Sequence, residues 1–227
     1  MRSIIALLAI SLVVMSCSKN DPVAPAESVI TVPGIGSSYT FSTYEIDENG
    51  APVPGTEGQQ VYSVAATGLV NMGKTGVWAV VSQAGDTLYF SADNKNDVWF
   101  RPSSGTDGPT LPWMRLPVTT GTPGRDSVTG TTEINGNSVD MTTTAATKRI
   151  GQDTVMIGTS SVKTQNIQID LSIKYSAFGM EQTVTITTFM FYAPKLGFYA
   201  GLASPPQNVG GKQSEGTGEE LQSFSIK

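Results

Sequence analysis

Apolar and polar residues alternate along most of the chain from position 28 onward. The run over 166–175 is the clearest, because every second residue in it is apolar while the residues between are polar. Its apolar residues are Ile167, Ile169, Leu171, Ile173 and Tyr175. A period of two is typical of a β-strand with one buried face, and an α-helix would scatter these residues around its axis. The run over 183–192 has the same pattern, so both segments are predicted as strands.

Similar runs, rich in β-branched and aromatic residues, predict further strands along the chain. They are Tyr39–Ile46, Val61–Val70, Val77–Ser82, Thr87–Ala92, Val98–Arg101, Ser127–Ile134, Ser138–Ile150, Thr154–Val162 and Leu221–Ile226. Short segments containing Gly or Asn at 47–50, 83–86, 135–137 and 177–179 predict the turns of antiparallel hairpins. The pattern therefore predicts an all-β fold, a single antiparallel meander of about ten to twelve strands.

A meander of this size is expected to curl, because strand twist accumulates and open edges invite aggregation. We expect a half-open or closed barrel, and a β-sandwich is the alternative. Two segments interrupt the strand pattern. The proline-rich segment Pro102–Asp126 is predicted to stay out of a central strand because proline lacks an N–H donor, and Pro205–Gly218 is predicted to be a mobile loop before the final strand.

The first sixteen residues have the layout of an export signal, with Arg2 followed by the apolar stretch Ile4–Val14. The stretch is shorter than the roughly 20 residues of a membrane-spanning helix. It is followed by Val14-Met15-Ser16-Cys17, the order of an aliphatic residue, a tolerant position, a small residue and cysteine that precedes the lipid-modified cysteine of bacterial lipoproteins. The alternative is an ordinary cleavage site that happens to contain a cysteine.

The predicted organisation is thus a signal peptide at 1–16, a lipidated Cys17 with a polar tether at 17–27, and a β domain at 28–227. This predicts export and attachment to the cell envelope through an acyl anchor, at the outer membrane. A lysine and an acid early in the tether leave open whether the protein faces the periplasm or the cell surface.

Composition narrows the chemistry. The chain has no histidine, which excludes histidine-based triads and almost every catalytic zinc site. Its formal net charge of −5 and lack of a basic run disfavour nucleic acid as a partner. The single cysteine excludes an intrachain disulfide.

The acids show no paired motif, and those next to predicted turns are expected to be solvated. They are Asp86, Asp97, Asp153 and Glu181. The oxygen-rich segment Asp93–Asp97 lacks the glycine and terminal glutamate of an EF-hand calcium loop, so a polar hairpin tip is expected there. No catalytic residue, cofactor or metal site is predicted.

One hairpin carries a resemblance. The segment Phe189–Tyr199, an aromatic strand that runs into Tyr-Ala-Pro, two residues and Gly, resembles a motif near the C-terminus of poorly characterised bacterial envelope lipoproteins. The segment Leu111–Pro117 resembles the middle of the same proteins. The resemblance implies a half-barrel or open β-barrel domain, broadly similar to the Lol-type lipoprotein carriers. Taken alone, Pro194 and Gly197 are typical of a structural hairpin.

Three functions follow from these observations. The first is a non-enzymatic envelope lipoprotein with a structural role or an envelope-protein partner. The second is the binding of an apolar or lipid-like ligand on the concave face of the sheet, and the third, least favoured, is a carboxylate-based hydrolase. Aromatic and methionine side chains suit an adaptable apolar site, and the candidates are Trp99, Trp113, Met114, Phe178, Met180, Met190 and Phe198.

Overall fold

The structure is a computed structural model and describes residues 29–93, 97–103, 111–119, 122–134, 137–177, 180–209 and 212–227. The predicted signal peptide, Cys17, the whole tether and Phe178 lie outside these residues. Within them, no helix is long and apolar enough to cross a membrane.

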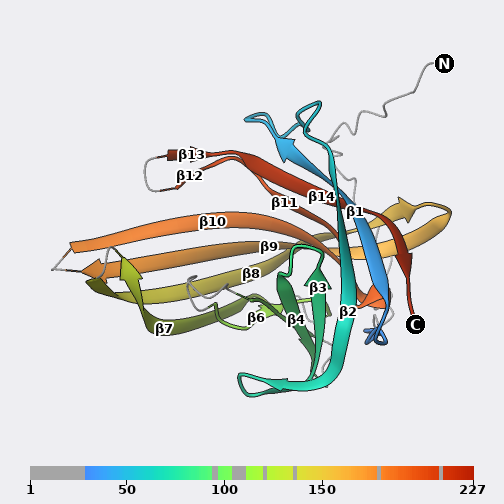
Figure 1. Cartoon of the computed structure of the whole chain (residues 1–227), viewed down its shortest axis with the longest axis horizontal. Helices are drawn as coiled ribbons and strands as arrows, with labels where there is room; N and C mark the ends of the chain where they lie inside the picture. The colour runs from blue at the N-terminus through green and yellow to red at the C-terminus, as the bar shows by residue number, and fades with distance from the viewer. Residues whose placement is uncertain are drawn as a thin grey trace, which may run out of the picture.

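Twelve antiparallel strands form one sheet that curls into a nearly closed barrel (Figure 1). Its strands are β1 (Ser38–Ile46), β2 (Gly58–Asn71), β3 (Lys74–Ser82), β4 (Thr87–Ala92), β5 (Val98–Pro102), β6 (Met114–Leu116), β7 (Gly124–Ile134), β8 (Asn137–Ile157), β9 (Ser160–Ala177), β10 (Met180–Ala193), β11 (Phe198–Ser204) and β14 (Gly216–Ser225). A separate hairpin joins β12 (Gln207–Val209) to β13 (Lys212–Ser214). The predicted all-β class and strand number are confirmed, and the sandwich alternative is not adopted.

The strand order is that of a meander closed through the ends of the chain. Across the sheet it is β6-β5-β4-β3-β2-β1-β14-β11-β10-β9-β8-β7, so the first strand pairs with the last. The two edges, β6 and β7, are consecutive in the sequence. Figure 1 shows that β8, β9 and β10 run across the direction of β1 to β3 and extend beyond them on one side.

The alternation predicted from the sequence sets the inner face of the barrel. Ile167, Ile169 and Ile173 on β9 are buried. On the opposite face of the same strand, Gln168 Nε2 donates a hydrogen bond to Asp170 Oδ1 at 2.9 Å. The prediction for this strand, with apolar residues on one face and polar residues on the other, is therefore confirmed.

Aromatic side chains fill one part of the barrel. The rings of Tyr39 and Phe198 stack with their centroids 4.5 Å apart, and Phe90 packs edge-on against Phe198 at 5.4 Å. Deep burial of such large apolar rings is a major source of stability. These side chains form the core that the single-cysteine chain needs in place of a disulfide.

The hairpin that carries the family resemblance closes this core. Pro194–Leu196 form a 3-10 turn, and Gly197 has a φ of 62°, in the left-handed region that favours glycine. Tyr39 Oη donates to the carbonyl oxygen of Leu196 at 2.8 Å, and Trp78 Nε1 donates to that of Gly197 at 3.1 Å. Both bonds are buried, so this segment has a structural role in the barrel.

Two predicted irregular segments contain strands. Pro205–Gly218, predicted to be a loop, contains the β12–β13 hairpin and the start of β14, so the final strand is longer than the predicted Leu221–Ile226. Its glycines fit there because the Tyr44 ring lies over Gly218, where an added β-carbon would be 2.4 Å from Tyr44 Cε2. Within Pro102–Asp126, β6 forms at the edge of the sheet, where the neighbouring prolines are tolerated.

The predicted strand Thr154–Val162 is also different in the structure. The segment spans the end of β8, a turn at Gly158 and the start of β9, and the φ of Gly158 is 57°. Val155 on β8 lies directly opposite Val162 on β9, so apolar residues on the two sides of this tight turn share one face and resemble a single run in the sequence.

Candidate functional site

A cavity of about 240 Å³ lies inside the barrel, beside the aromatic core. Its walls are formed by strands from both halves of the sheet, β2 and β4 to β6 on one side and β9 to β11 and β14 on the other. Six of its apolar residues are Leu88, Phe100, Met114, Ile169, Leu171 and Ile186. A water molecule occupies roughly 30 Å³ of liquid, so the space exceeds a few waters and approaches the roughly 300 Å³ at which small-molecule pockets begin.

The strand register explains why these side chains meet. Leu171 lies directly opposite Ile186, and Phe100 lies opposite Met114. Residues directly opposite in an antiparallel pair point to the same face of the sheet. Both pairs point inward, and their side chains leave the space that larger rings fill elsewhere in the barrel.

One acidic residue lines this apolar space in the part of the chain that the structure describes. Glu219 on β14 lines the cavity and accepts a hydrogen bond from Tyr199 Oη at 2.7 Å on Oε1. Tyr62 Oη donates to Oε2 of the same carboxyl group at 3.1 Å. Both tyrosines also line the cavity, so two phenols and one carboxyl group form its polar corner.

Burial perturbs all three groups. It raises the pKa of Glu219 above its ordinary value, and the hydrogen bonds from Tyr199 and Tyr62 oppose that shift. Burial is also the main cause that raises the pKa of Tyr199 and of Tyr62, and the nearby Glu219 raises both further. The two phenols therefore stay protonated and act as donors at physiological pH.

A second hollow of about 360 Å³ adjoins the cavity. The two spaces share Leu202 and Glu219, which lie opposite each other on β11 and β14. The second hollow is more polar than the cavity, since Thr43, Glu45 and Thr217 contribute to its walls. Glu219 thus lines both an apolar cavity and a more polar hollow.

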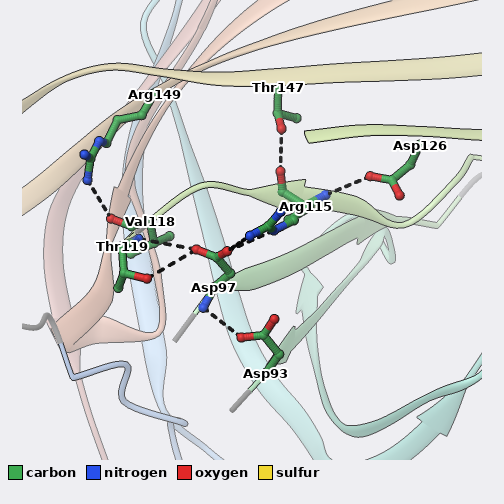
Figure 2. A network of polar contacts seen from close by, with 8 residues as sticks. All are labelled: Asp93, Asp97, Arg115, Val118, Thr119, Asp126, Thr147 and Arg149. Carbon is green, nitrogen blue, oxygen red and sulfur yellow. Dashed lines mark hydrogen bonds and ion pairs between the residues drawn. The ribbon is translucent and has the colours of Figure 1, made fainter. Parts of the chain in front are cut away.

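Side chains rather than a backbone ladder close the barrel between β6 and β7 (Figure 2). The Arg115 backbone N–H donates to Asp126 Oδ2 at 3.4 Å, and the Thr147 hydroxyl donates to the Arg115 carbonyl oxygen. Arg149 Nη1 donates to the Val118 carbonyl oxygen at 3.1 Å. These contacts join β6, which supplies Met114 to the cavity, to β7 and β8.

Asp97 departs from the expectation that acids next to turns are solvated. Its side chain is fully buried, and Arg115 Nε donates to its Oδ2 at 2.9 Å. Its own backbone N–H donates to Asp93 Oδ1 at 3.0 Å, and Figure 2 shows Thr119 on its other side. Burial is tolerated because the carboxylate is paired and hydrogen-bonded.

Among the described residues, no group of three or more metal-ligating side chains lies together. Asp93 and Asp97 are held in the structural contacts above. The three residues between them lie outside the described part of the chain.

The predicted ligand-binding residues have different positions in the structure. Met114 lines the cavity, whereas Met190 and Phe198 are completely buried in the core. Trp113 is buried and its Nε1 donates to the Asn71 carbonyl oxygen at 3.2 Å. Phe178 lies outside the described residues.

Two of the predicted residues lie away from the cavity. Met180, at the start of β10, is 71% exposed. Trp99 alternates with the inward-facing Phe100, and the Lys74 ammonium lies 3.2 Å from its ring centroid. A preference for aromatic and methionine residues does not distinguish the two faces of a strand, and the alternation does.

The sequence prediction missed the polar corner and the aliphatic walls. Leu171 and Ile186 belong to predicted strands, and the alternation places each on the apolar face, but the predicted ligand set contained only aromatic and methionine residues. Glu219 was missed because the glycines at 216 and 218 gave its strand the composition of a loop. Tyr62 and Tyr199 were missed because nothing in the sequence distinguishes them from other tyrosines in strands.

No family model matches the sequence, and no curated protein matches it. Two solved structures are similar. A candidate lipoprotein of Parabacteroides distasonis has a TM-score of 0.40 and 8% identity, over 88% of this chain and 100% of the other. A candidate exported protein with a YmcC-like fold from Bacteroides fragilis has a TM-score of 0.37 and 10% identity, over 87% and 99%.

At these TM-scores the likeness concerns general architecture, and neither description extends to this chain. The predicted similarity to lipoprotein carriers of the Lol type is not tested by these structures and stays a prediction.

Proposed function

We propose that this protein is a non-enzymatic lipoprotein of the bacterial cell envelope, anchored through Cys17, whose barrel binds the apolar part of a ligand. The observation that carries the proposal is the apolar cavity inside the barrel, where Glu219 is the one charged residue among the described lining residues. A cavity of this kind gains binding free energy from excluded water and orientation from a few polar groups.

The size of the cavity limits the ligand. Its volume of about 240 Å³ accommodates one short alkyl chain or a small ring system, and a multi-chain lipid would not fit within it. Leu171 and Ile186 form one wall, and Phe100 and Met114 form another, so a single chain would contact aliphatic and soft side chains on both sides.

Probe binding tests the proposal. The full chain carrying Cys17→Ser, which removes the acylation site, is titrated with the uncharged apolar fluorophore N-phenyl-1-naphthylamine. We expect a saturable rise and blue shift of its emission. The variant Leu171→Trp fills the cavity and weakens binding on the order of tenfold, which corresponds to about 1.4 kcal/mol.

A matched control uses the same new side chain at another position. Ile150 is 52% exposed on β8, so Ile150→Trp leaves probe binding unchanged. Absence of saturable binding, or an equal loss in both variants, would overturn the cavity as a ligand site.

The anchor is tested separately. In cells given an alkyne analogue of palmitate, the wild-type chain becomes labelled and sediments with envelope membranes. The variant Cys17→Ser loses the label. A labelled Cys17→Ser chain, or an unlabelled wild type that retains residues 1–16, would overturn the proposed location.

The aromatic cluster favours a second candidate, a structural or interaction role. Tyr39 and Phe90 both pack against Phe198, and all three side chains are completely buried, as in a filled core. Under this candidate, a photo-crosslinking amino acid at the exposed Met180 yields one discrete adduct with an envelope protein, and a probe at the exposed Val70 does not. Identical patterns at both sites would argue against it.

A further inference from the structure

The cavity and the more polar second hollow share the carboxyl-bearing residue Glu219. Leu202 and Glu219 line both spaces, so an apolar chain in the cavity would continue past Glu219 into the hollow. A ligand that fills both must have an apolar tail and a polar end. The chemistry around Glu219 then decides which polar end is accepted.

Glu219 has unused acceptor capacity. A carboxylate presents about four lone-pair directions, and the described hydrogen bonds from Tyr199 and Tyr62 use part of them. Because both phenols act as donors toward Glu219, their hydroxyl protons are not available to a ligand. The polar corner therefore offers acceptors to an incoming group.

The charge of the hollow has the same sign throughout. Glu45 and Glu219 are its charged lining residues, and no Lys or Arg is found among the described residues that line either space. The remaining polar side chains there include the hydroxyl groups of Thr43 and Thr217. An anionic group would meet two carboxyl groups without a cation, and such like-charge contacts cost several kcal/mol.

We infer that the site takes a single-chain amphiphile whose head group donates hydrogen bonds, an alcohol or an ammonium, and that it rejects carboxylate and phosphate head groups. This inference rests on the proposed function, because it assumes that the cavity holds the apolar tail. Charge complementarity with Glu219 and Glu45, together with the free acceptor positions of Glu219, selects the head group.

A displacement series tests the inference. Decylamine, decanol and decanoate have the same tail and compete with the bound fluorophore on the Cys17→Ser chain at pH 7.5, below their micellar concentrations. We expect decylamine and decanol to displace the fluorophore at concentrations on the order of tenfold lower than decanoate. Displacement by decanoate at an equal or lower concentration, or by none of the three, would overturn the inference.

Two variants test whether Glu219 is the source of the selectivity among head groups. Glu219→Gln removes the charge at the junction and narrows the difference between decylamine and decanoate. Glu181→Gln makes the same change at an exposed site paired with Lys174, and it leaves the ranking unchanged. Should Glu219→Gln fail to fold, Glu45→Gln gives a second reading of the same effect, and the wild-type ranking alone already decides the inference.

The two failures are distinguishable. If the fluorophore itself does not bind, the cavity is not a ligand site and the proposed function fails. If it binds with the expected response to Leu171→Trp while decanoate competes best, the cavity stands and the head-group inference alone is wrong.

Discussion

The guanidinium group of Arg115, within the proline-rich segment, donates a hydrogen bond from Nε to the fully buried carboxylate of Asp97, which precedes that segment. This ion pair fixes the edge strand β6, whose Met114 lines the cavity and whose backbone meets β7 and β8. The position of this edge strand, one wall of the cavity and the closure of the barrel therefore all depend on the ion pair between Asp97 and Arg115.

Removal of this pair should destabilise the barrel. In Asp97→Ala, Arg115 keeps its charge but loses its buried partner, and we expect the free energy of unfolding to fall by about 3 kcal/mol. Urea denaturation monitored by tryptophan fluorescence measures the change. Asp97→Asn keeps a hydrogen-bonding side chain and should lose less; equal stability of Asp97→Ala and wild type would contradict the role.

Gly124 allows β7 to approach β6. An added β-carbon would lie 2.8 Å from the Arg115 carbonyl oxygen, so Gly124→Ala should lower the free energy of unfolding by about 1–3 kcal/mol. Hydrogen exchange at the β6 and β7 amides should accelerate. Gly130→Ala on the same strand meets nothing within 4 Å and is the control, with no loss expected; similar losses in both variants would contradict the close approach.

The buried and the exposed members of the predicted ligand set should respond differently to truncation. Phe198 is completely buried against Tyr39 and Phe90, so Phe198→Ala should cost about 3–5 kcal/mol of unfolding free energy. Met180 is 71% exposed, and Met180→Ala should stay within about 0.5 kcal/mol of wild type. Thermal denaturation separates the two, and a tolerant Phe198→Ala would show that this part of the core is not packed as described.

Glu219 should make stability depend on pH. Its pKa is raised by burial, so the folded state binds more protons than the unfolded state between the ordinary pKa of glutamate and that of Glu219. Its contribution to stability therefore falls as pH rises through this window, and the cost is fully present above the raised pKa. Chemical denaturation at pH 4 and at pH 7.5 measures the free energy of unfolding of Glu219→Gln and of wild type. We expect the variant's stability relative to wild type to be greater at pH 7.5 than at pH 4. A difference that is the same at both values would show that Glu219 titrates normally.

The sequence predicted much of the barrel because its strands depend on local alternation. Runs such as 166–175 keep one apolar face, and the structure places that face inward. The start of β14 was not predictable in this way, since Gly216 and Gly218 are glycines required by the close approach of Ile46 and of the Tyr44 ring, which are residues distant in the sequence. Strand assignment from the sequence fails where a residue type, here glycine, is required by contact with a residue that is distant in the sequence.

The site was less predictable than the fold. Whether Leu171 meets another side chain or empty space depends on how far apart the walls of the barrel lie, and strand alternation carries no information on that distance. The burial of Asp97 depends on Arg115, which lies 18 residues later in the sequence, within the proline-rich segment. Such features arise from the closure of the barrel rather than from any one segment.

The pairing of β1 with β14 places the beginning and the end of the domain side by side, with Ser38 opposite Ser225. While the ribosome is still making the chain, β1 can find β2 but not its second neighbour. The backbone donors and acceptors on the other side of β1 find their partners only when β14 has been made, nearly a whole domain later in the sequence. This long-range pairing gives the barrel a high contact order, which makes its folding slow compared with that of helical domains of equal length.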